Sequence, residues 1–192
     1  MYYPSIDSYY ESHFLSDLRT TQCLLQRINE IKSLHQRLSP KEELTPELTL
    51  EQLRYYRNPN NVKGRFRSFE IPKKSGGVRI ITAPLSLEYQ WILRALAEML
   101  EHAYTPSDYA MGFVQHRSIL TNAQAHEGKN YVFNLDLKDF FPSIRQARVC
   151  ARLQCPPFSL NRELAATIAG LVAMRQEQVS STETYVQYVL PQ

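Results

Sequence analysis

This sequence of 192 residues has neither a long apolar run nor a C-x-x-C pair of cysteines. The longest charge-free apolar stretch typical of a helix, residues 164–174, has eleven residues, whereas a helix that crosses a bilayer needs about 20. The first residues lack the basic and apolar regions of a secretory signal, so we expect a cytoplasmic protein without a membrane segment. Cys23, Cys150 and Cys155 include no C-x-x-C pair, so neither a disulfide framework nor a zinc ligand set is indicated.

Positive charge is concentrated in one segment, although the whole chain carries a formal net charge of only +3. Residues 54–79 contain eight basic side chains and one acid, with aromatic residues among them. This composition is typical of a surface that binds a polyanion such as RNA. The alternative is an ordinary solvated basic face, and charge alone leaves both open. The eight basic residues are Arg54, Arg57, Lys63, Arg65, Arg67, Lys73, Lys74 and Arg79.

Hydrophobic spacing and capping residues predict a mixed α+β fold. Apolar residues three or four apart indicate helices over residues 14–38, 86–104 and 160–175. Thr49 and Ser118 are typical caps of two shorter helices. Two β-rich runs around a loop with two glycines indicate a hairpin over residues 66–81, and further strands are expected at residues 131–136 and 186–190.

Asp136 lies at the end of the expected strand 131–136. A carboxylate held there has a fixed direction and an open side, which suits a ligand of Mg²⁺, and Asp139 follows three residues later. The alternative is an aspartate that begins a turn. On position alone, the turn is the more common use of such a residue.

Several ordered blocks in the sequence resemble those of bacterial reverse transcriptases. Residues 69–84 read FEIPKKSGGVRIITAP, residues 112–113 GF, residues 117–119 RSI, residues 134–144 NLDLKDFFPSI and residues 189–192 VLPQ. Residues 122–126, NAQAH, are similar to a block that marks the retron enzymes within the larger group that contains the group II intron maturases. The resemblance covers residues 66–192, and the first sixty residues add nothing diagnostic. One smaller mismatch is His116, where a glycine is usual.

The resemblance implies a role for individual residues in a two-metal polymerase. Asp136 would be the first of three metal-binding carboxylates, with the carbonyl of Leu137 as a further ligand of Mg²⁺. Lys73, Lys74 and Arg79 would hold the incoming triphosphate. The nucleotide pocket would be completed by Asp139, Phe140, Phe141, which would exclude a ribose 2′-hydroxyl, and Gln192, which would contact the sugar.

Other candidate residues have less defined roles. Arg54, Arg57, Lys63, Arg65 and Arg67 would bind the RNA template, and the role of Asn122 and His126 in their block is open. Ordinary alternatives remain for several positions: Phe141 as a core residue, the two lysines as a solvated hairpin tip, His126 as a helix end and Gln192 as a terminus.

The sequence departs from the family pattern in its carboxylates. The family's other two metal ligands form a Tyr-x-Asp-Asp hairpin, and no Asp-Asp pair occurs here; the five aspartates are Asp7, Asp17, Asp108, Asp136 and Asp139. The family's thumb is also missing. We therefore expect an N-terminal fragment of a reverse transcriptase, inactive by itself and with weak or absent binding of Mg²⁺.

These observations predict an α+β fold that comprises an N-terminal helical region (1–60), polymerase fingers (61–130) and a partial palm (131–192). The expected parent function is retron-like RNA-directed DNA polymerisation in the bacterial cytoplasm. Its expected partners are an RNA template, a DNA primer and deoxynucleoside triphosphates. The alternatives are a group II intron maturase, a reverse transcriptase of antiviral defence, and a non-catalytic RNA-binding module. The sequence leaves the oligomeric state open.

Overall fold

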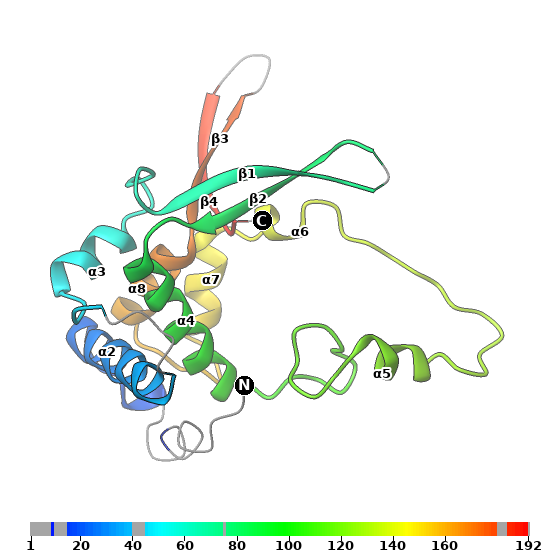
Figure 1. Ribbon diagram of the computed structural model, residues 1–192, viewed down its shortest axis with the longest axis horizontal. Helices are drawn as coiled ribbons and strands as arrows, with labels where there is room; N and C mark the ends of the chain where they lie inside the picture. Colours follow the sequence, from blue (N-terminus) through cyan, green and yellow to red (C-terminus); the bar gives the residue numbers. More distant parts are fainter. Residues whose placement is uncertain (1–8, 10–14, 40–44, 75, 180–183, 192) are drawn as a thin grey trace.

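Four helical elements precede residue 104 in the computed structural model, which describes residues 9, 15–39, 45–74, 76–179 and 184–191 (Figure 1). They are the short 3₁₀ helix η1 (Leu15–Asp17) and the helices α2 (Thr21–Leu38), α3 (Leu50–Arg57) and α4 (Leu87–His102). Each α-helix begins at a hydroxyl that accepts a backbone N–H: Thr20 from Cys23, Thr49 from Gln52 and Ser86 from Tyr89. The helices expected at Thr49 and 86–104 are confirmed, and the single helix expected at 14–38 is present from Thr21 onward, with η1 before it.

Three further helices follow residue 139: α6 (Phe140–Ser143), α7 (Gln146–Leu153) and α8 (Arg162–Val172). α8 is the most buried of them, and Leu164, Ile168 and Leu171 on it are almost fully buried. These side chains join those of α2, α3 and α4 in one apolar core. α8 confirms the helix expected at 160–175, whereas α6 and α7 were not predicted.

The described strands form two separate antiparallel hairpins. β1 (Phe66–Pro72) pairs with β2 (Val78–Pro84), and β3 (Met174–Val179) pairs with β4 (Thr184–Val189). The first hairpin confirms the expectation for residues 66–81, and β4 confirms the strand expected at 186–190. The α+β class is therefore confirmed. No helix in the described ranges is long and apolar enough to cross a membrane.

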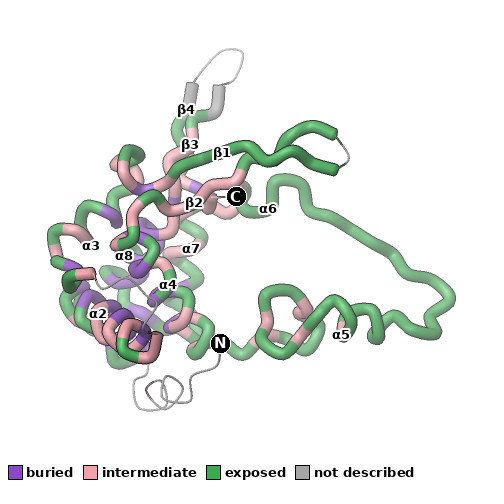
Figure 2. The backbone as a smooth tube through the Cα atoms, viewed as in Figure 1, coloured by how far each residue is buried: buried purple, intermediate pink, exposed green. Residues whose placement is uncertain are grey.

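Residues 105–139 leave the helical body and return to it (Figure 2). This excursion contains the short helix α5 (Ile119–Gln124), which Ser118 caps as expected, and its residues are almost all exposed. The strand predicted at 131–136 does not form: residues 131–137 have neither helical nor strand structure. High β-propensity is not sufficient for a strand, because the backbone of a strand needs hydrogen bonds to a neighbouring strand. Residues 131–136 have no described strand beside them.

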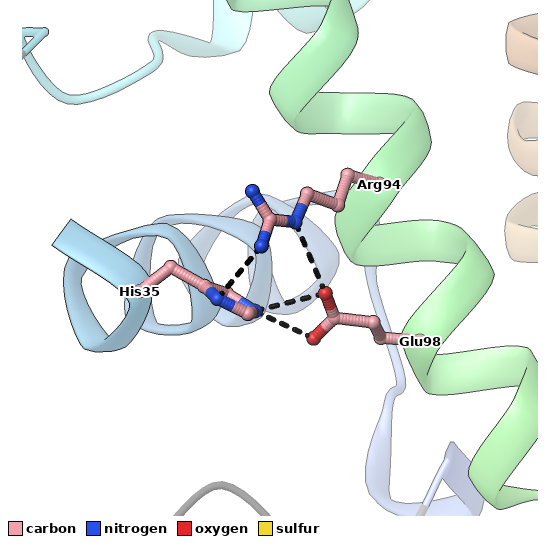
Figure 3. Close-up of polar contacts among 3 residues, drawn as sticks. All are labelled: His35, Arg94 and Glu98. Atoms are coloured by element: carbon pink, nitrogen blue, oxygen red, sulfur yellow. Dashed lines mark hydrogen bonds and ion pairs between the residues drawn. The ribbon is translucent and has the colours of Figure 1, made fainter. Parts of the chain in front are cut away.

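A polar triangle joins α2 to α4 (Figure 3). The Nε2 of the buried His35 lies 2.8 Å and 2.9 Å from the two carboxylate oxygens of Glu98, and the Arg94 guanidinium lies 3.0 Å from Nδ1. A guanidinium only donates hydrogen bonds, so we assign Nδ1 as the acceptor and Nε2 as the donor to Glu98. The triangle thus fixes the spacing of the two helices at the edge of the apolar core.

Candidate functional site

The β1–β2 hairpin extends from the body and carries three of the predicted triphosphate ligands (Figure 1). Arg79 faces Ile71 across the two strands, and Lys73 and Lys74 follow the end of β1. All three cations are exposed. The loop closes through the Lys73 N–H, which donates to the Gly77 carbonyl at 3.0 Å, and Gly76 and Gly77 both have positive φ angles of 85° and 80°.

The two faces of this hairpin differ in chemistry. Residues opposite one another in the register share a face, so Arg67, Phe69 and Ile71 lie on the same side as Arg79 and Ile81. The guanidinium of Arg67 lies 5.9 Å from the centre of the Phe69 ring. This face therefore offers both cations and an exposed aromatic ring, which is the combination that binds phosphates and bases of single strands.

Arg65 is a correction to the sequence-based prediction. Its side chain is 1% exposed, because the guanidinium enters the core at the base of the hairpin. It donates at 2.9 Å to the Tyr89 hydroxyl and to the carbonyl oxygens of Gly170 and Leu171. Burial lowers the pKa of Arg65 and raises that of Tyr89 to about 12. A guanidinium enclosed in this way cannot reach an RNA phosphate, so its role is structural.

The other four predicted RNA ligands are exposed. Arg54 and Arg57 lie in the last turn of α3, and the Arg57 guanidinium donates to the Thr167 hydroxyl at 3.4 Å. Lys63 lies in the connection to β1, where its carbonyl accepts the Tyr55 hydroxyl at 2.6 Å. With Arg67 on β1, these cations lie within one stretch of chain that includes the end of α3 and the start of the hairpin.

Asp136 and Leu137 lie in the exposed excursion, between α5 and α6. A carboxylate and a carbonyl oxygen are suitable ligands for Mg²⁺. In the described ranges, however, no three His, Cys, Asp or Glu side chains come together to hold a metal ion. The residues present therefore fit only part of a two-metal site, and we derive no catalytic step from them.

Asp139, Phe140 and Phe141 lie where the excursion returns to the body. Asp139 has a φ of 51° and directly precedes α6, and its carbonyl accepts the N–H of Ser143 at 2.9 Å. The rings of Phe140 and Phe141 pack edge to face with centres 5.4 Å apart. α6 contacts β4, and the Leu190 N–H donates to the Ile144 carbonyl at 3.1 Å, so the two phenylalanines lie near the end of β4. Gln192 lies outside the described residues.

Asn122 and His126 are placed on and just after α5, and both are exposed. α5 lies apart from the β1–β2 hairpin (Figure 1). Sequence reasoning missed the residue that organises the neighbouring loop: Arg117 donates to the carbonyls of Ser107 and Ala110, both at 2.6 Å. Its position in the RSI block was the available signal, but that block was used only as a family mark.

Comparison with curated proteins identifies relatives of this chain. It is 38% identical over 128 residues to the Retron Mx65 reverse transcriptase of Myxococcus xanthus, which covers 66% of this chain and 29% of the relative. This chain is homologous to a portion of the retron reverse transcriptases. The Retron Mx162 reverse transcriptase of the same organism is 40% identical over 107 residues, covering 53% of this chain and 21% of the relative. The Retron Ec86 reverse transcriptase of Escherichia coli is 36% identical over 90 residues, covering 44% and 27%.

These matches set the extent of the homology with the retron reverse transcriptases. The chain spans less than a third of the length of each of these three relatives. No family model matches the sequence. The homology therefore supports a shared origin for this part of the chain, and the activity of the whole retron enzymes comes to it only as a proposal.

Proposed function

We propose that this chain forms the fingers and the opening part of the palm of a retron-like reverse transcriptase, an RNA-directed DNA polymerase. The single observation that carries the proposal is the 38% identity over 128 residues to the Retron Mx65 reverse transcriptase. In this proposal residues 1–60 are an N-terminal helical region, 61–130 the fingers and 131–192 a partial palm. The relatives come from bacteria, and we propose a bacterial, cytoplasmic enzyme.

The exposed cations support a nucleic-acid role for the hairpin and its base. Lys73, Lys74 and Arg79 would hold the triphosphate of a deoxynucleotide, since an ammonium and a guanidinium are the usual partners of polyphosphates. Arg54, Arg57, Lys63 and Arg67 would contact phosphates of the RNA template. The primer and the incoming sugar would lie toward Asp139, Phe140, Phe141 and Gln192.

Magnesium belongs to the proposal for the whole enzyme. When bound, two Mg²⁺ ions supply activation of the primer hydroxyl and charge stabilisation at the leaving group. Asp136 and the Leu137 carbonyl are the residues of this chain that would contribute oxygen ligands. A retron-like enzyme would need further carboxylates beside them, and the absence of any Asp-Asp pair from the 192 residues leaves that requirement unmet by this sequence.

A second candidate is a non-catalytic RNA-binding module, which the exposed cations of the hairpin and its base would serve equally well. The two candidates share the basic surface and differ in Asp136. In a protein that joins this chain to a Tyr-x-Asp-Asp hairpin, the enzyme proposal predicts that Asp136→Asn abolishes extension while RNA binding is kept. Activity within about tenfold of wild type, a barrier change of only about 1.4 kcal/mol, would contradict the role of Asp136 as a metal ligand. A group II intron maturase and a defence reverse transcriptase share this chemistry and remain alternatives of subtype.

The chain itself provides a direct test of the nucleic-acid surface. We expect it to bind a single-stranded RNA oligonucleotide with an affinity that falls linearly with salt on logarithmic axes. Replacing both Lys63 and Arg67 with Ala should reduce the salt slope by up to about 0.7 for each lost phosphate contact. The matched control replaces Arg148 and Arg162, two exposed cations on α7 and α8, and should leave the slope unchanged.

Two outcomes of this titration would contradict the proposal. One is an RNA affinity that is insensitive to salt, and the other is an equal change of slope in the control variant. Either result would mean that Lys63 and Arg67 are ordinary solvated side chains and do not bind RNA.

A further inference from the structure

Arg65 connects the bases of the two hairpins. Its carbonyl accepts the N–H of Leu85 at 2.8 Å, a hydrogen bond that closes the first hairpin where β1 and β2 join the body. Its guanidinium donates at 2.9 Å to the carbonyls of Gly170 and Leu171, in the last turn of α8. β3 begins at Met174, two residues after the end of α8. One buried residue therefore joins the start of the first hairpin to the start of the second.

Tyr188 supplies a second contact between the same two regions. Its hydroxyl, on β4, donates to the side-chain oxygen of Asn60 at 2.9 Å. Asn60 lies in the connection that leads from α3 to β1. In the described part of the chain the two hairpins belong to separate sheets, so no ladder of backbone hydrogen bonds joins them. The contacts of Arg65 and Tyr188 at the bases therefore relate the direction of one hairpin to that of the other.

The two hairpins position different parts of the proposed nucleotide site. The first carries Lys73 and Arg79, the proposed ligands of the triphosphate. The end of the second is attached beside Phe141, because the Leu190 N–H donates to the carbonyl of Ile144, directly after α6. A deoxynucleotide joins its triphosphate to its sugar covalently. Both sets of ligands can therefore bind it at once only when their separation is correct.

The length of the first hairpin makes its direction at the base important. Lys73 lies eight residues beyond Arg65, which corresponds to roughly 26 Å of extended chain. A rotation of about 5° at the base would then move the hairpin loop by about 2 Å. A displacement of that size separates a cation from a bound phosphate, because hydrogen bonds from nitrogen to oxygen span only about 2.7–3.2 Å.

We propose that Arg65 is a positioning residue of the nucleotide site. Through the last turn of α8, and together with the contact of Tyr188, it sets the direction in which the cationic hairpin leaves the body relative to the second hairpin. Arg65 does not itself touch the nucleotide, since its side chain is 1% exposed. The connection between the hairpins stands without the proposed function, whereas the effect on nucleotide binding rests on it.

Spin labels on the two hairpins measure their relative direction. With the three cysteines replaced by Ala, Ile80→Cys on β2 and Val186→Cys on β4 place one label at an exposed position of each hairpin. Pulsed dipolar spectroscopy of the folded chain should give one narrow distribution of distances. Arg65→Lys keeps the charge but not the planar fork of donors, and it should broaden or shift the distribution by about 2 Å. Tyr188→Phe removes only a hydroxyl, so it keeps the fold and should change the distribution in the same sense.

Tyr55→Phe is the matched control for the distances. It also removes a hydroxyl near the base of the first hairpin, but the Tyr55 hydroxyl donates to the Lys63 carbonyl, in the same connection to β1, and not to the second hairpin. We expect this variant to leave the distribution unchanged. Circular dichroism of each variant checks that the labelled chain is folded.

Two ligands distinguish positioning from a general loss of structure. Inorganic tripolyphosphate needs only the hairpin cations, whereas a deoxynucleoside triphosphate also needs the sugar pocket. In titrations of the folded chain, Arg65→Lys and Tyr188→Phe should leave the affinity for tripolyphosphate unchanged. They should weaken binding of the deoxynucleotide by about two- to tenfold, the value of one neutral hydrogen bond. Arg79→Ala should weaken binding of both ligands.

Three results would overturn the proposal. They are a distance distribution that neither Arg65→Lys nor Tyr188→Phe changes, an equal change in Tyr55→Phe, and an equal loss of affinity for both ligands in Arg65→Lys. A different result would count against the proposed function: if Arg79→Ala leaves both affinities unchanged, the triphosphate site is wrong, and Arg65 has no role in nucleotide binding. The distances alone then decide whether Arg65 orients the two hairpins.

Discussion

The guanidinium of Arg65 lies 2.9 Å from the carbonyl oxygen of Gly170, although 105 residues separate them in the sequence. Arg65 directly precedes β1, and Gly170 lies in the last turn of α8. The last carbonyls of a helix have no hydrogen-bond donor within the helix and carry partial negative charge. A buried guanidinium supplies both the donor and the opposite charge. This contact attaches the base of the cationic hairpin to the helical core.

Removing that cation should destabilise the whole fold. Arg65→Met keeps an unbranched apolar stem but removes the donor to the Tyr89 hydroxyl and to the Gly170 carbonyl, and the Leu171 carbonyl keeps only its hydrogen bond from the Tyr89 hydroxyl. We expect a loss of about 3 kcal/mol in the free energy of unfolding, measured by urea denaturation. Arg67→Met, two residues away on the exposed strand, is the control and should change it by less than about 0.5 kcal/mol. Equal effects of the two variants would contradict the structural role of Arg65.

Gly170 permits a close approach between α8 and the end of α3. A Cβ atom placed there would overlap the carbonyl oxygen of Arg57, a backbone atom that cannot turn aside. Gly170→Ala should therefore cost about 1–3 kcal/mol, although alanine is the better helix former. Gly112→Ala, where the new methyl meets nothing within 4 Å, is the matched control. A thermal melt in which Gly170→Ala is as stable as wild type would show that the two helices do not pack this closely.

The polar triangle of His35, Arg94 and Glu98 predicts a pH dependence of stability. Burial opposes the charged form of Glu98, but the hydrogen bond from His35 and the charge of Arg94 outweigh it, so the pKa of Glu98 is lowered. A lowered carboxyl pKa contributes stability that is complete above the unfolded-state value of about 4.3 and is lost as the pH falls through the folded-state value. We expect this contribution to disappear between about pH 5 and pH 3.

Urea denaturation across that pH range measures the contribution of Glu98. Glu98→Gln should flatten the acid limb of the stability curve and cost about 1 kcal/mol at pH 7. Glu101→Gln, an exposed position on the same helix, should leave the curve unchanged. The same acid limb in both variants would mean that the triangle does not contribute.

The hairpin cations should affect nucleotide binding separately from RNA binding. In a titration of the chain with a deoxynucleoside triphosphate, Arg79→Ala and Lys73→Ala should each weaken binding several-fold, because each removes one charge from an exposed phosphate ligand. Arg54→Ala, on α3, should leave that binding nearly unchanged while it weakens binding to RNA. A nucleotide affinity that Arg79→Ala does not alter would remove Arg79 from the proposed triphosphate site.

Local signals in the sequence were sufficient for α2, α3, α4, α5, α8 and the first hairpin, whereas α6 and α7 were not predicted. Thr49 and Ser118 cap helices as predicted, because a cap needs only the backbone of the next turn. The strand at 131–136 was predicted from equally clear residues and does not form, because strand structure requires a neighbour that may lie anywhere in the chain.

The same distinction explains what could be predicted of the candidate site. The exposed positions of Lys73 and Arg79 follow from a local hairpin and its loop. Arg65 was assigned to the same basic surface, but its burial depends on Tyr89, Gly170 and Leu171, which no local pattern connects to it. Whether Asp136 joins other carboxylates is likewise a question of distant contacts.

The excursion of residues 105–139 separates, along the sequence, two segments that both contribute residues to the apolar core. Leu24, Ile28 and Ile92 come from before it, and Leu164 and Ile168 come from after it, yet all five belong to one cluster. A single protease cut within residues 127–138 would therefore cleave the chain, but the two pieces would stay associated through the apolar core. The two pieces should run as distinct bands on a denaturing gel and elute together from a sizing column under native conditions. The two halves could therefore be expressed from separate genes and would reassemble.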